Sequence, residues 1–443
     1  MQAIIPKKLF IKIGLIIVLT GILLTSVAYS ALTYSVNIPS SGTIAGSEIT
    51  AVSGSAHDIQ EAVNVVAAAG GGTVRIPAGN YTFNITKDGS TDLANAITGV
   101  KIPGGVNVIG AGNNQTVLYC STNCWNSGGN TGQSMFTLDG SNGKPTRISG
   151  IYFQGSINYT VSNGYGGENA GLSAICEYGV TNFRIDHCTF IDFNCFAIYC
   201  DGNRIRNEYS NSGVIDHCII DNPYRDSMLP HNSTASDWAL WAYGIGVVGD
   251  YSTWDLDISN YLGVHRSLTV YIEDNAFSRC RHAIASNGNG FYVSRYNYFE
   301  KCLYGANDVH GNAGNGIGGR GLESYSNTFN LTDESYSGGQ DSAFQIRGGG
   351  GVCWNNTIIL NADIQANPVG LIRDSNVPPY DVEDLFFWDN IVLSNGASVA
   401  FTINNLGNYV ENVNYFLRAP TLEQDSFSYT PYAYPHPLTL TSP

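Results

Sequence analysis

Polar and ionisable side chains recur at one position of a short strand-like segment. Six such segments lie between residues 197 and 374, and their fifth residues are Asp201, Val248, Asn287, His310, Arg347 and Asp374. Residues two apart on a strand share a face, so Asp308 is expected beside His310, and Gln345 beside Arg347. Histidine can transfer a proton, arginine can bind a carboxylate with two bonds, and paired carboxylates can act as acid and base. Stacked segments would form one polar stripe.

A second repeat marks the elements that would stack these segments. It consists of Asn or Cys, any residue and a large apolar residue, and it begins at Cys188, Cys218, Asn275, Asn297, Asn327, Asn356 and Asn390. A variable period of about 22 residues or more is typical of a solenoid, in which each coil of chain stacks on the last. An inward Asn at each corner can bond to turn backbone and to the Asn of the next coil.

A helix with one apolar face is expected before the coils. Residues 58–69 place Ile59, Val63 and Val66 on one side, and three glycines follow. Such a helix would cover the open end of a solenoid core. The run 58–81, followed by 106–112, resembles the N-terminal cap and next coil of the pectin lyase-like superfamily. The resemblance implies an all-β fold, a right-handed parallel β-helix with an N-terminal capping helix.

The N-terminal residues resemble a secretory signal. Lys7, Lys8 and Lys12 precede the apolar run 13–24, and small residues stand near position 30. The expected organisation is a signal peptide at 1–30, a lead-in segment at 31–52, a β-helix at 53–419 with a long inserted loop at 221–268, and a C-terminal tail at 420–443. The protein is therefore expected to be secreted or at the cell surface, with an uncleaved anchor as the alternative. No later segment is long and apolar enough to cross a membrane.

Charge restricts the class of partner. The formal net charge is −15, and removal of the three lysines with the signal makes it −18. A chain this acidic is not expected to bind nucleic acid. Basic residues nevertheless gather between positions 279 and 373, at Arg279, Arg281, Arg295, Lys301, Arg320, Arg347 and Arg373. A local cationic strip would suit a uronate-containing polysaccharide, because arginine matches carboxylates.

The leading hypothesis is a polysaccharide lyase that acts by β-elimination. Lyases of this fold remove the proton next to a uronate carboxylate, so they need a base and a group that stabilises the developing charge. In this chain His310 or Arg320 would be the base, while Arg347 and Arg373 would bind the carboxylate. The chain lacks the acidic calcium cluster of well-known pectate lyases and the Asp-Asp and Gly-His-Gly signatures of polygalacturonase-like members.

Carboxylates and a second histidine leave alternatives open. A glycoside hydrolase needs two carboxylates across the scissile bond, for which Asp308 with Glu323, or Asp201 with Asp308, are candidates. Asp201 and Asp308 could instead hold Ca²⁺, although no residue is assigned as a metal ligand. His282 and Asp201 are also expected to contact the glycan. A non-catalytic glycan-binding or adhesion module is the alternative from a different class.

Ten cysteines follow the expected signal. Cys280 and Cys302 each stand three residues after the apolar residue of the repeat. Stacked coils are about 4.8 Å apart, which lies within the Cα range of a disulfide. A disulfide is expected here, with two stacked thiols as the alternative. Cys188 above Cys218 is expected to be core stacking.

Overall fold

A computed structural model describes residues 47–83, 97–120, 133–155, 172–193, 195–202, 211–223, 242–249, 257–264, 269–302, 304–311, 317–332, 342–361, 367–374 and 381–440. The expected signal peptide and most of the expected lead-in segment lie outside these ranges. Within them, no helix combines the length and apolar character needed to cross a bilayer.

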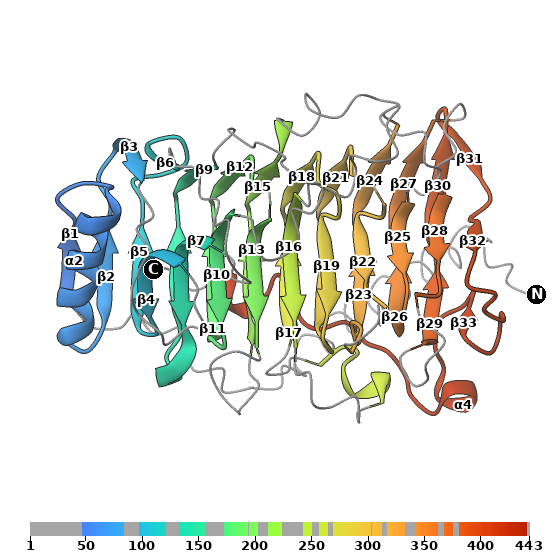
Figure 1. Cartoon of the computed structure of the whole chain (residues 1–443). Coiled ribbons are helices and arrows are strands. Elements are labelled where there is room, and N and C mark those ends of the chain that lie inside the picture. Colours follow the sequence, from blue (N-terminus) through green and yellow to red (C-terminus); the bar gives the residue numbers. More distant parts are fainter. Residues whose placement is uncertain are drawn as a thin grey trace, which may run out of the picture. The chain divides into compact units, whose positions relative to one another are not determined.

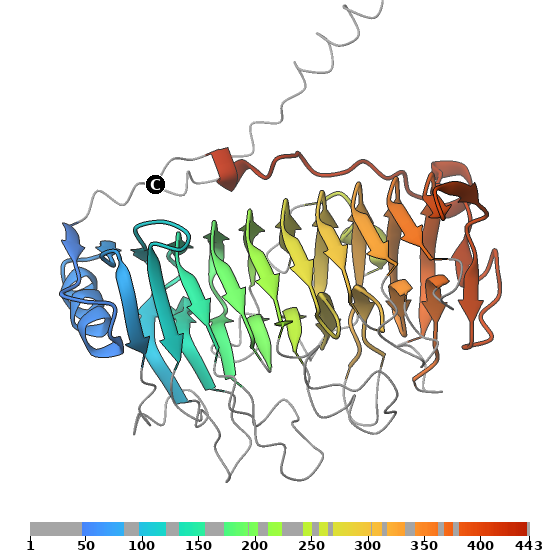
Figure 2. The same ribbon diagram turned by 90° about the horizontal axis from the view of Figure 1, so that it is seen from above.

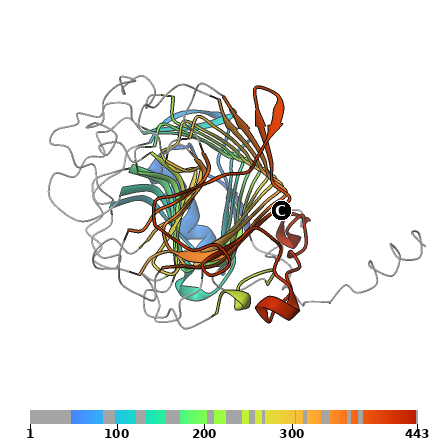
Figure 3. The same ribbon diagram turned by 90° about the vertical axis from the view of Figure 1, so that its right-hand side faces the viewer.

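Three sheets of stacked strands surround one core (Figures 1 and 3). In spatial order, sheet A contains β1 (Ser47–Thr50), β2 (Gly72–Arg75), β5 (Val106–Ile109), β8 (Arg147–Ser149), β11 (Thr181–Asp186), β14 (Ser212–Asp216), β17 (Thr269–Glu273), β20 (Phe291–Arg295), β23 (Gly321–Tyr325), β26 (Gly349–Trp354), β29 (Val382–Trp388) and β33 (Tyr415–Phe416). Sheet B contains β3 (Gly79–Phe83), β6 (Thr116–Cys120), β9 (Tyr152–Gln154), β12 (Thr189–Ile191), β15 (Ile219–Asp221), β18 (Ala276–Ser278), β21 (Tyr298–Glu300), β24 (Thr328–Leu331), β27 (Thr357–Leu360), β30 (Ile391–Ser394) and β31 (Ala397–Val399). Sheet C contains β4 (Ile97–Pro103), β7 (Gln133–Asp139), β10 (Leu172–Tyr178), β13 (Phe196–Asp201), β16 (Tyr243–Val248), β19 (Ile284–Asn287), β22 (Asn307–Val309), β25 (Ser342–Ile346), β28 (Asn367–Leu371) and β32 (Ile403–Asn405).

Strands of successive coils pair in parallel and in register. On sheet B, Phe277 lies opposite Phe299, which lies opposite Phe329, and the rings stack with centroids 5.0 and 4.7 Å apart. Only the terminal β30–β31 pair is antiparallel among the strands of the described ranges. The fold is a right-handed parallel β-helix, as the sequence predicts.

The asparagine column stands at the corner between sheets A and B. Asn297 Nδ2 donates to Asn327 Oδ1 at 3.1 Å, and Asn327 Nδ2 donates to Asn356 Oδ1 at 3.1 Å. The same oxygens accept from the backbone N–H groups of Asn297 and Asn327. Asn275 and Asn390 extend the column at its two ends. These side chains satisfy buried corner backbone, so the predicted structural role of the column is confirmed.

Helix α2 (Ala56–Ala68) covers the first coil, as predicted (Figure 1). Ser55 caps its N-terminus by accepting from the backbone N–H of Asp58. Ile59, Val63 and Val66 are buried in the same core as the coils. Strand β1, which falls in the expected lead-in segment, pairs with β2 and belongs to the first coil.

The expected inserted loop at 221–268 is wrong as a single element. Strand β16 lies inside it and pairs with β13 and β19 in sheet C. A short 3-10 helix, Ile258–Asn260, also falls within this region. Strand β16 therefore divides the expected loop into two connections, one from β15 of sheet B and one to β17 of sheet A.

The C-terminal residues run back along the outer face of sheet A (Figure 2). Helix α4 (Leu422–Asp425) begins this segment, and a 3-10 helix, Pro437–Leu440, ends it. Tyr429 Oη donates to Glu323 at 2.7 Å, and the Leu438 carbonyl accepts from Arg184 at 3.3 Å. We call residues 426–440 the strap. It contacts coils that are far apart in the sequence.

The expected disulfide between Cys280 and Cys302 is wrong. Each thiol donates to a backbone carbonyl of its own coil, Cys280 to Ser278 at 3.5 Å and Cys302 to Glu300 at 3.3 Å. Both side chains are buried, so the alternative of stacked thiols holds. Cys188 and Cys218 are likewise buried core residues without a disulfide.

Candidate functional site

An open pocket of about 460 Å³, part of it continuous with solvent, lies on sheet C. Its lining combines apolar surface from β13, β16 and β19 with aromatic rings and polar side chains. Phe196, Tyr199 and Tyr243 supply the rings, and Ser286, Asn287 and His310 supply further polar groups. Ring faces beside hydrogen-bonding groups are the usual lining of a small-molecule or sugar site.

His310 follows β22 and contributes an imidazole to this lining. Its Nδ1 lies 2.7 Å from the Gly311 carbonyl, which can only accept, so Nδ1 carries the proton and Nε2 keeps its lone pair. Burial and the charge of Arg347 lower the pKa of His310, against the opposing effect of Asp308. The side chain remains 27% exposed. His310 is therefore a neutral base that a ligand can reach.

A carboxylate–arginine–carboxylate chain stands beside His310. Arg347 donates to both oxygens of Asp308, at 3.0 and 2.7 Å, and to Asp374 Oδ2 at 3.0 Å. Burial raises the pKa of Asp308, but the charge and hydrogen bonds of Arg347, together with His282 and His310, outweigh it and leave this pKa below its ordinary value. His310 Nδ1 lies 3.9 Å from Asp374 Oδ2. The expected grouping of Asp308, His310 and Arg347 is thus present.

The expected register is wrong at Asp374. Strand β28 pairs Gly370 with Gln345 and Leu371 with Ile346, so Ile372, and not Asp374, falls beside Arg347. Asp374 reaches the arginine from two residues further along, where the chain has left the strand.

His282 lies behind the pocket and not in it. Its side chain is buried, its Nδ1 is 2.9 Å from the Gly305 carbonyl, and its ring packs against Tyr243. Burial lowers the pKa of His282 to about 3. The expectation that this histidine contacts a glycan is not supported, because it is a neutral core residue. It lies behind the rings of Phe196, Tyr199 and Tyr243, which we call the aromatic wall.

Asp201 and Asp308 are too far apart to act together. Asp201 ends β13 and Asp308 lies on β22, and β16 and β19 separate these strands. Three strand spacings amount to about 14 Å, whereas paired glycosidase carboxylates lie at most about 9.5 Å apart and calcium ligands converge within a few ångströms. Among the described residues, no three His, Cys, Asp or Glu side chains form a metal-binding group. The expectation of a shared calcium or hydrolase pair at these residues is wrong.

Arg320 and Glu323 belong to another side of the solenoid. Arg320 is buried, with Nη2 at 3.7 Å from Glu383 and its guanidinium 5.8 Å from the Tyr261 ring. Glu323 lies on β23 of sheet A, where it accepts from the Gly263 N–H at 2.6 Å and from Tyr429 of the strap. Glu323 therefore cannot pair with Asp308 across a bond, and Arg320 is closed to a substrate.

The expected cationic strip is largely neutralised. Arg279 pairs with Asp221, and Arg295 pairs with Glu273 at 2.6 Å. Arg373 Nε lies 3.2 Å from Asp381 Oδ1, and its guanidinium lies 4.6 Å from the Tyr409 ring. Tertiary pairing, which the sequence does not show, places a carboxylate at each of these arginines.

The sequence repeats did not predict the aromatic wall of the pocket. Tyr199 stands two residues before Asp201 on the same strand, so the period-two rule that placed Asp308 beside His310 also places Tyr199 on the outer face. Phe196 and Tyr243 lie opposite each other at the starts of β13 and β16, with ring centroids 5.0 Å apart. The expected alignment of Asp201 with Val248 already implies this pairing, but Phe196 and Tyr243 lie one residue before the segments that define the alignment.

No family model matches the chain, and no curated protein matches it. Solved structures with a similar fold include an alginate lyase from Paenibacillus sp. str. FPU-7, at 12% identity and a TM-score of 0.46, covering 83% of this chain and 99% of that one. The A-module of a mannuronan C-5 epimerase from Azotobacter vinelandii has 14% identity and a TM-score of 0.44, covering 86% and 96%. The tailspike protein of E. coli bacteriophage HK620, in complex with a pentasaccharide, has 12% identity and a TM-score of 0.41, covering 79% and 60%. The fold assignment rests on the strand pairing described above.

Proposed function

We propose that the protein is a secreted, carbohydrate-active β-helix enzyme, a polysaccharide lyase that cleaves a uronate-containing glycan in the pocket of sheet C. One observation carries this proposal: a neutral, partly exposed His310 stands at the end of an aromatic wall. Sugar rings stack on aromatic faces, so the wall would place a sugar next to the base.

The proposed reaction assigns the proton transfer to His310. Its Nε2 takes the proton from the carbon next to the uronate carboxylate, the released electron pair forms a carbon–carbon double bond, and the glycosidic carbon–oxygen bond breaks. The imidazolium then carries the proton that the leaving oxygen needs. A base that must be neutral to accept this proton fits a histidine with a lowered pKa.

Arg347 is proposed to stabilise the negative charge that develops at the carboxylate. Three of its five N–H groups donate to Asp308 and Asp374 within the described residues, and its side chain is 14% exposed. The two carboxylates hold the guanidinium in a fixed orientation beside the base, and its remaining N–H groups can meet a substrate oxygen.

The test is an assay of purified protein with a panel of uronate polymers, which follows the ultraviolet absorbance of the unsaturated product. The variant His310→Gln should lower the rate by about 100-fold or more while the glycan still binds, because a general base contributes about this much. His57→Gln, at an exposed histidine of helix α2, is the matched control and should be fully active. New reducing ends without that absorbance would identify hydrolysis and reject the lyase.

A non-catalytic glycan-binding module is the second candidate. The observation that favours it is the pairing of Arg347 with Asp308 and Asp374 and of Arg373 with Asp381, because both arginines assigned to the uronate carboxylate already hold protein carboxylates. Retention of glycan by wild-type protein, with no product from any polymer, would select this candidate.

A further inference from the structure

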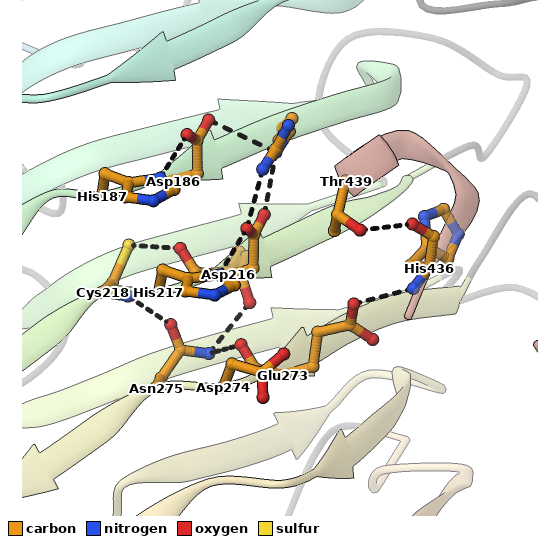
Figure 4. A network of polar contacts seen from close by, with 12 residues as sticks. Asp186, His187, Asp216, His217, Cys218, Glu273, Asp274, Asn275, His436 and Thr439 are labelled. Carbon is orange, nitrogen blue, oxygen red and sulfur yellow. Dashed lines mark hydrogen bonds and ion pairs between the residues drawn. The ribbon is translucent and has the colours of Figure 1, made fainter. Parts of the chain in front are cut away.

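Two histidines occupy the same corner position on neighbouring coils, away from the pocket of sheet C. His187 follows β11 and His217 follows β14, where the chain turns from sheet A to sheet B (Figure 4). Both have left-handed backbone, with φ of 52° and 54°, a conformation in which histidine is enriched over most residues. The turn directs both side chains outward, where they are 57% and 51% exposed.

Each imidazole is oriented by a buried carboxylate. His187 Nδ1 donates to Asp186 Oδ2 at 2.8 Å, and His217 Nδ1 donates to Asp216 Oδ2 at 2.9 Å (Figure 4). Both carboxylate side chains are 0% exposed. Because a carboxylate accepts, both Nδ1 atoms carry protons, and each Nε2 is left with a lone pair. This is the outer arrangement that metal-ligating histidines almost always have.

The carboxylates are themselves held in place. Arg147 donates to both oxygens of Asp186, at 2.7 and 2.8 Å, and Arg184 donates to both oxygens of Asp216, at 3.0 and 2.9 Å. Two arginines balance two carboxylates, so a ligand at the imidazoles meets a rigid and nearly neutral support. The geometry around the two rings is more constrained than surface histidines require.

The two rings are parallel neighbours. Their centroids are 4.9 Å apart and their planes differ by 4°. Because the rings are parallel, their Nε2 lone pairs point the same way, and one ion would bind them at adjacent coordination positions. With metal–nitrogen bonds of about 2.0–2.1 Å, two such nitrogens lie about 3 Å apart, so the rings must tilt toward each other and close by about 2 Å at Nε2. The next coil places Asp274 at the same turn position, and its negative charge favours a cation.

We propose that His187 and His217 form a site for one borderline divalent transition cation, Cu²⁺, Ni²⁺ or Zn²⁺, which the two Nε2 atoms bind. Water completes the coordination. Imidazole is a suitable ligand for all three ions, and Cu²⁺ should bind most tightly. The site is independent of the proposed glycan cleavage and would hold even if the pocket were not catalytic.

The test uses the full chain without a histidine tag and measures binding of each metal ion alone by isothermal titration calorimetry. His187→Asn and His217→Asn are suitable variants, because Asn tolerates left-handed backbone and its amide can still donate to the buried carboxylate. Each should weaken Cu²⁺ binding by about tenfold or more, as loss of even an outer partner does. His57→Asn is the matched control and should bind as the wild type does.

Electron paramagnetic resonance of the Cu²⁺ complex gives a second measurement. The wild type should show two imidazole nitrogens on the ion, and each single variant should show one. Unchanged affinity or an unchanged number of nitrogens in both variants would overturn the proposal and leave the histidines as covers for buried carboxylates. An equal loss of binding in His57→Asn would also overturn it, because the ion would then bind without a defined site.

Discussion

The outer faces of sheets A and C both carry arginine–carboxylate pairs. The strap covers the pair on sheet A, whereas an open pocket lies beside the pair on sheet C. On sheet A, Arg295 pairs with Glu273, and the strap closes over both. The Tyr432 and Ala433 carbonyls accept from Arg295, and the His436 N–H donates to Glu273. On sheet C, Arg347 pairs with Asp308, and the pocket beside it is open. Arg295 is 0% exposed and Arg347 is 14% exposed.

This difference shows that solvent access, and not residue type, separates arginine–carboxylate pairs that stabilise the solenoid from the pair that is a candidate for binding or catalysis. A carboxylate–arginine pair under the strap has its hydrogen bonds satisfied by protein and no route for a ligand. The same pair on sheet C lies next to a partly exposed base. The comparison assigns stability to one face and binding to the other, and each assignment can be tested.

The largest effect is expected at Arg295. Its removal in Arg295→Met leaves Glu273 as a buried carboxylate without its ion pair and takes hydrogen bonds from Tyr325 and the strap. The free energy of unfolding should fall by about 3–5 kcal/mol, measured by chemical denaturation. Arg75→Met, at an exposed pair with Glu48, is the control and should change the free energy of unfolding far less. Similar losses in both variants would break the comparison.

A smaller effect, with a defined pH dependence, is expected at Glu323. Burial raises its pKa to about 7, above the ordinary value of about 4.3. The folded protein then holds a proton that the unfolded chain releases between these values. The stabilising contribution of this carboxyl is therefore complete below about pH 4 and is lost as the pH rises through about 7.

The variant Glu323→Gln stays neutral at every pH and should remove this dependence. Between about pH 5 and 8 the wild type should lose on the order of 2 kcal/mol more than the variant in the free energy of unfolding, measured by denaturant titration at each pH. Glu48→Gln, at an exposed carboxylate, should keep the wild-type dependence. Parallel curves for wild type and Glu323→Gln would mean that the strap does not exclude water from sheet A.

The smallest effect is expected at Tyr199 and concerns affinity. Tyr199→Ala removes one ring of the aromatic wall and should weaken glycan binding by about 1 kcal/mol, the scale of an aromatic stacking contact. The unfolding free energy should change much less than in Arg295→Met, because Tyr199 is only partly buried. Isothermal titration calorimetry with a glycan that the wild type binds measures the affinity. An unchanged affinity together with a large loss of stability would show that sheet C, like sheet A, serves stability and not binding.

The fold was predictable because its repeat is local in the sequence. An Asn followed two residues later by Phe, Ile or Val sets the corner and the interior column of each coil, and Asn297, Asn327 and Asn356 are stacked as expected. The separate repeat of strand-like segments, with the rule that residues two apart share a face, placed Asp308, His310 and Arg347 together. The prediction failed at Asp374, because β28 pairs Gly370 with Gln345 and not with Ala343, two residues from the expected register.

The remaining errors concern contacts between sheets or with the strap. Glu323 follows Asp308 by fifteen residues, but an intervening corner turns its strand into sheet A. The partners of Arg295 include residues 137 and 138 positions away in the strap. No repeat encodes such contacts, so neither the neutralisation of the arginines nor the burial of Glu323 could be inferred from spacing.

The strap has a mechanical consequence. A solenoid whose coils contact only their neighbours can open one coil at a time from either end. Here Leu438 is bonded to Arg184 across 254 positions, and Tyr434 is bonded to Asp274 across 160. A force on the C-terminus must break these lateral bonds one after another before it acts on the last coils. The strap therefore protects the C-terminal end of the solenoid from unfolding under tension.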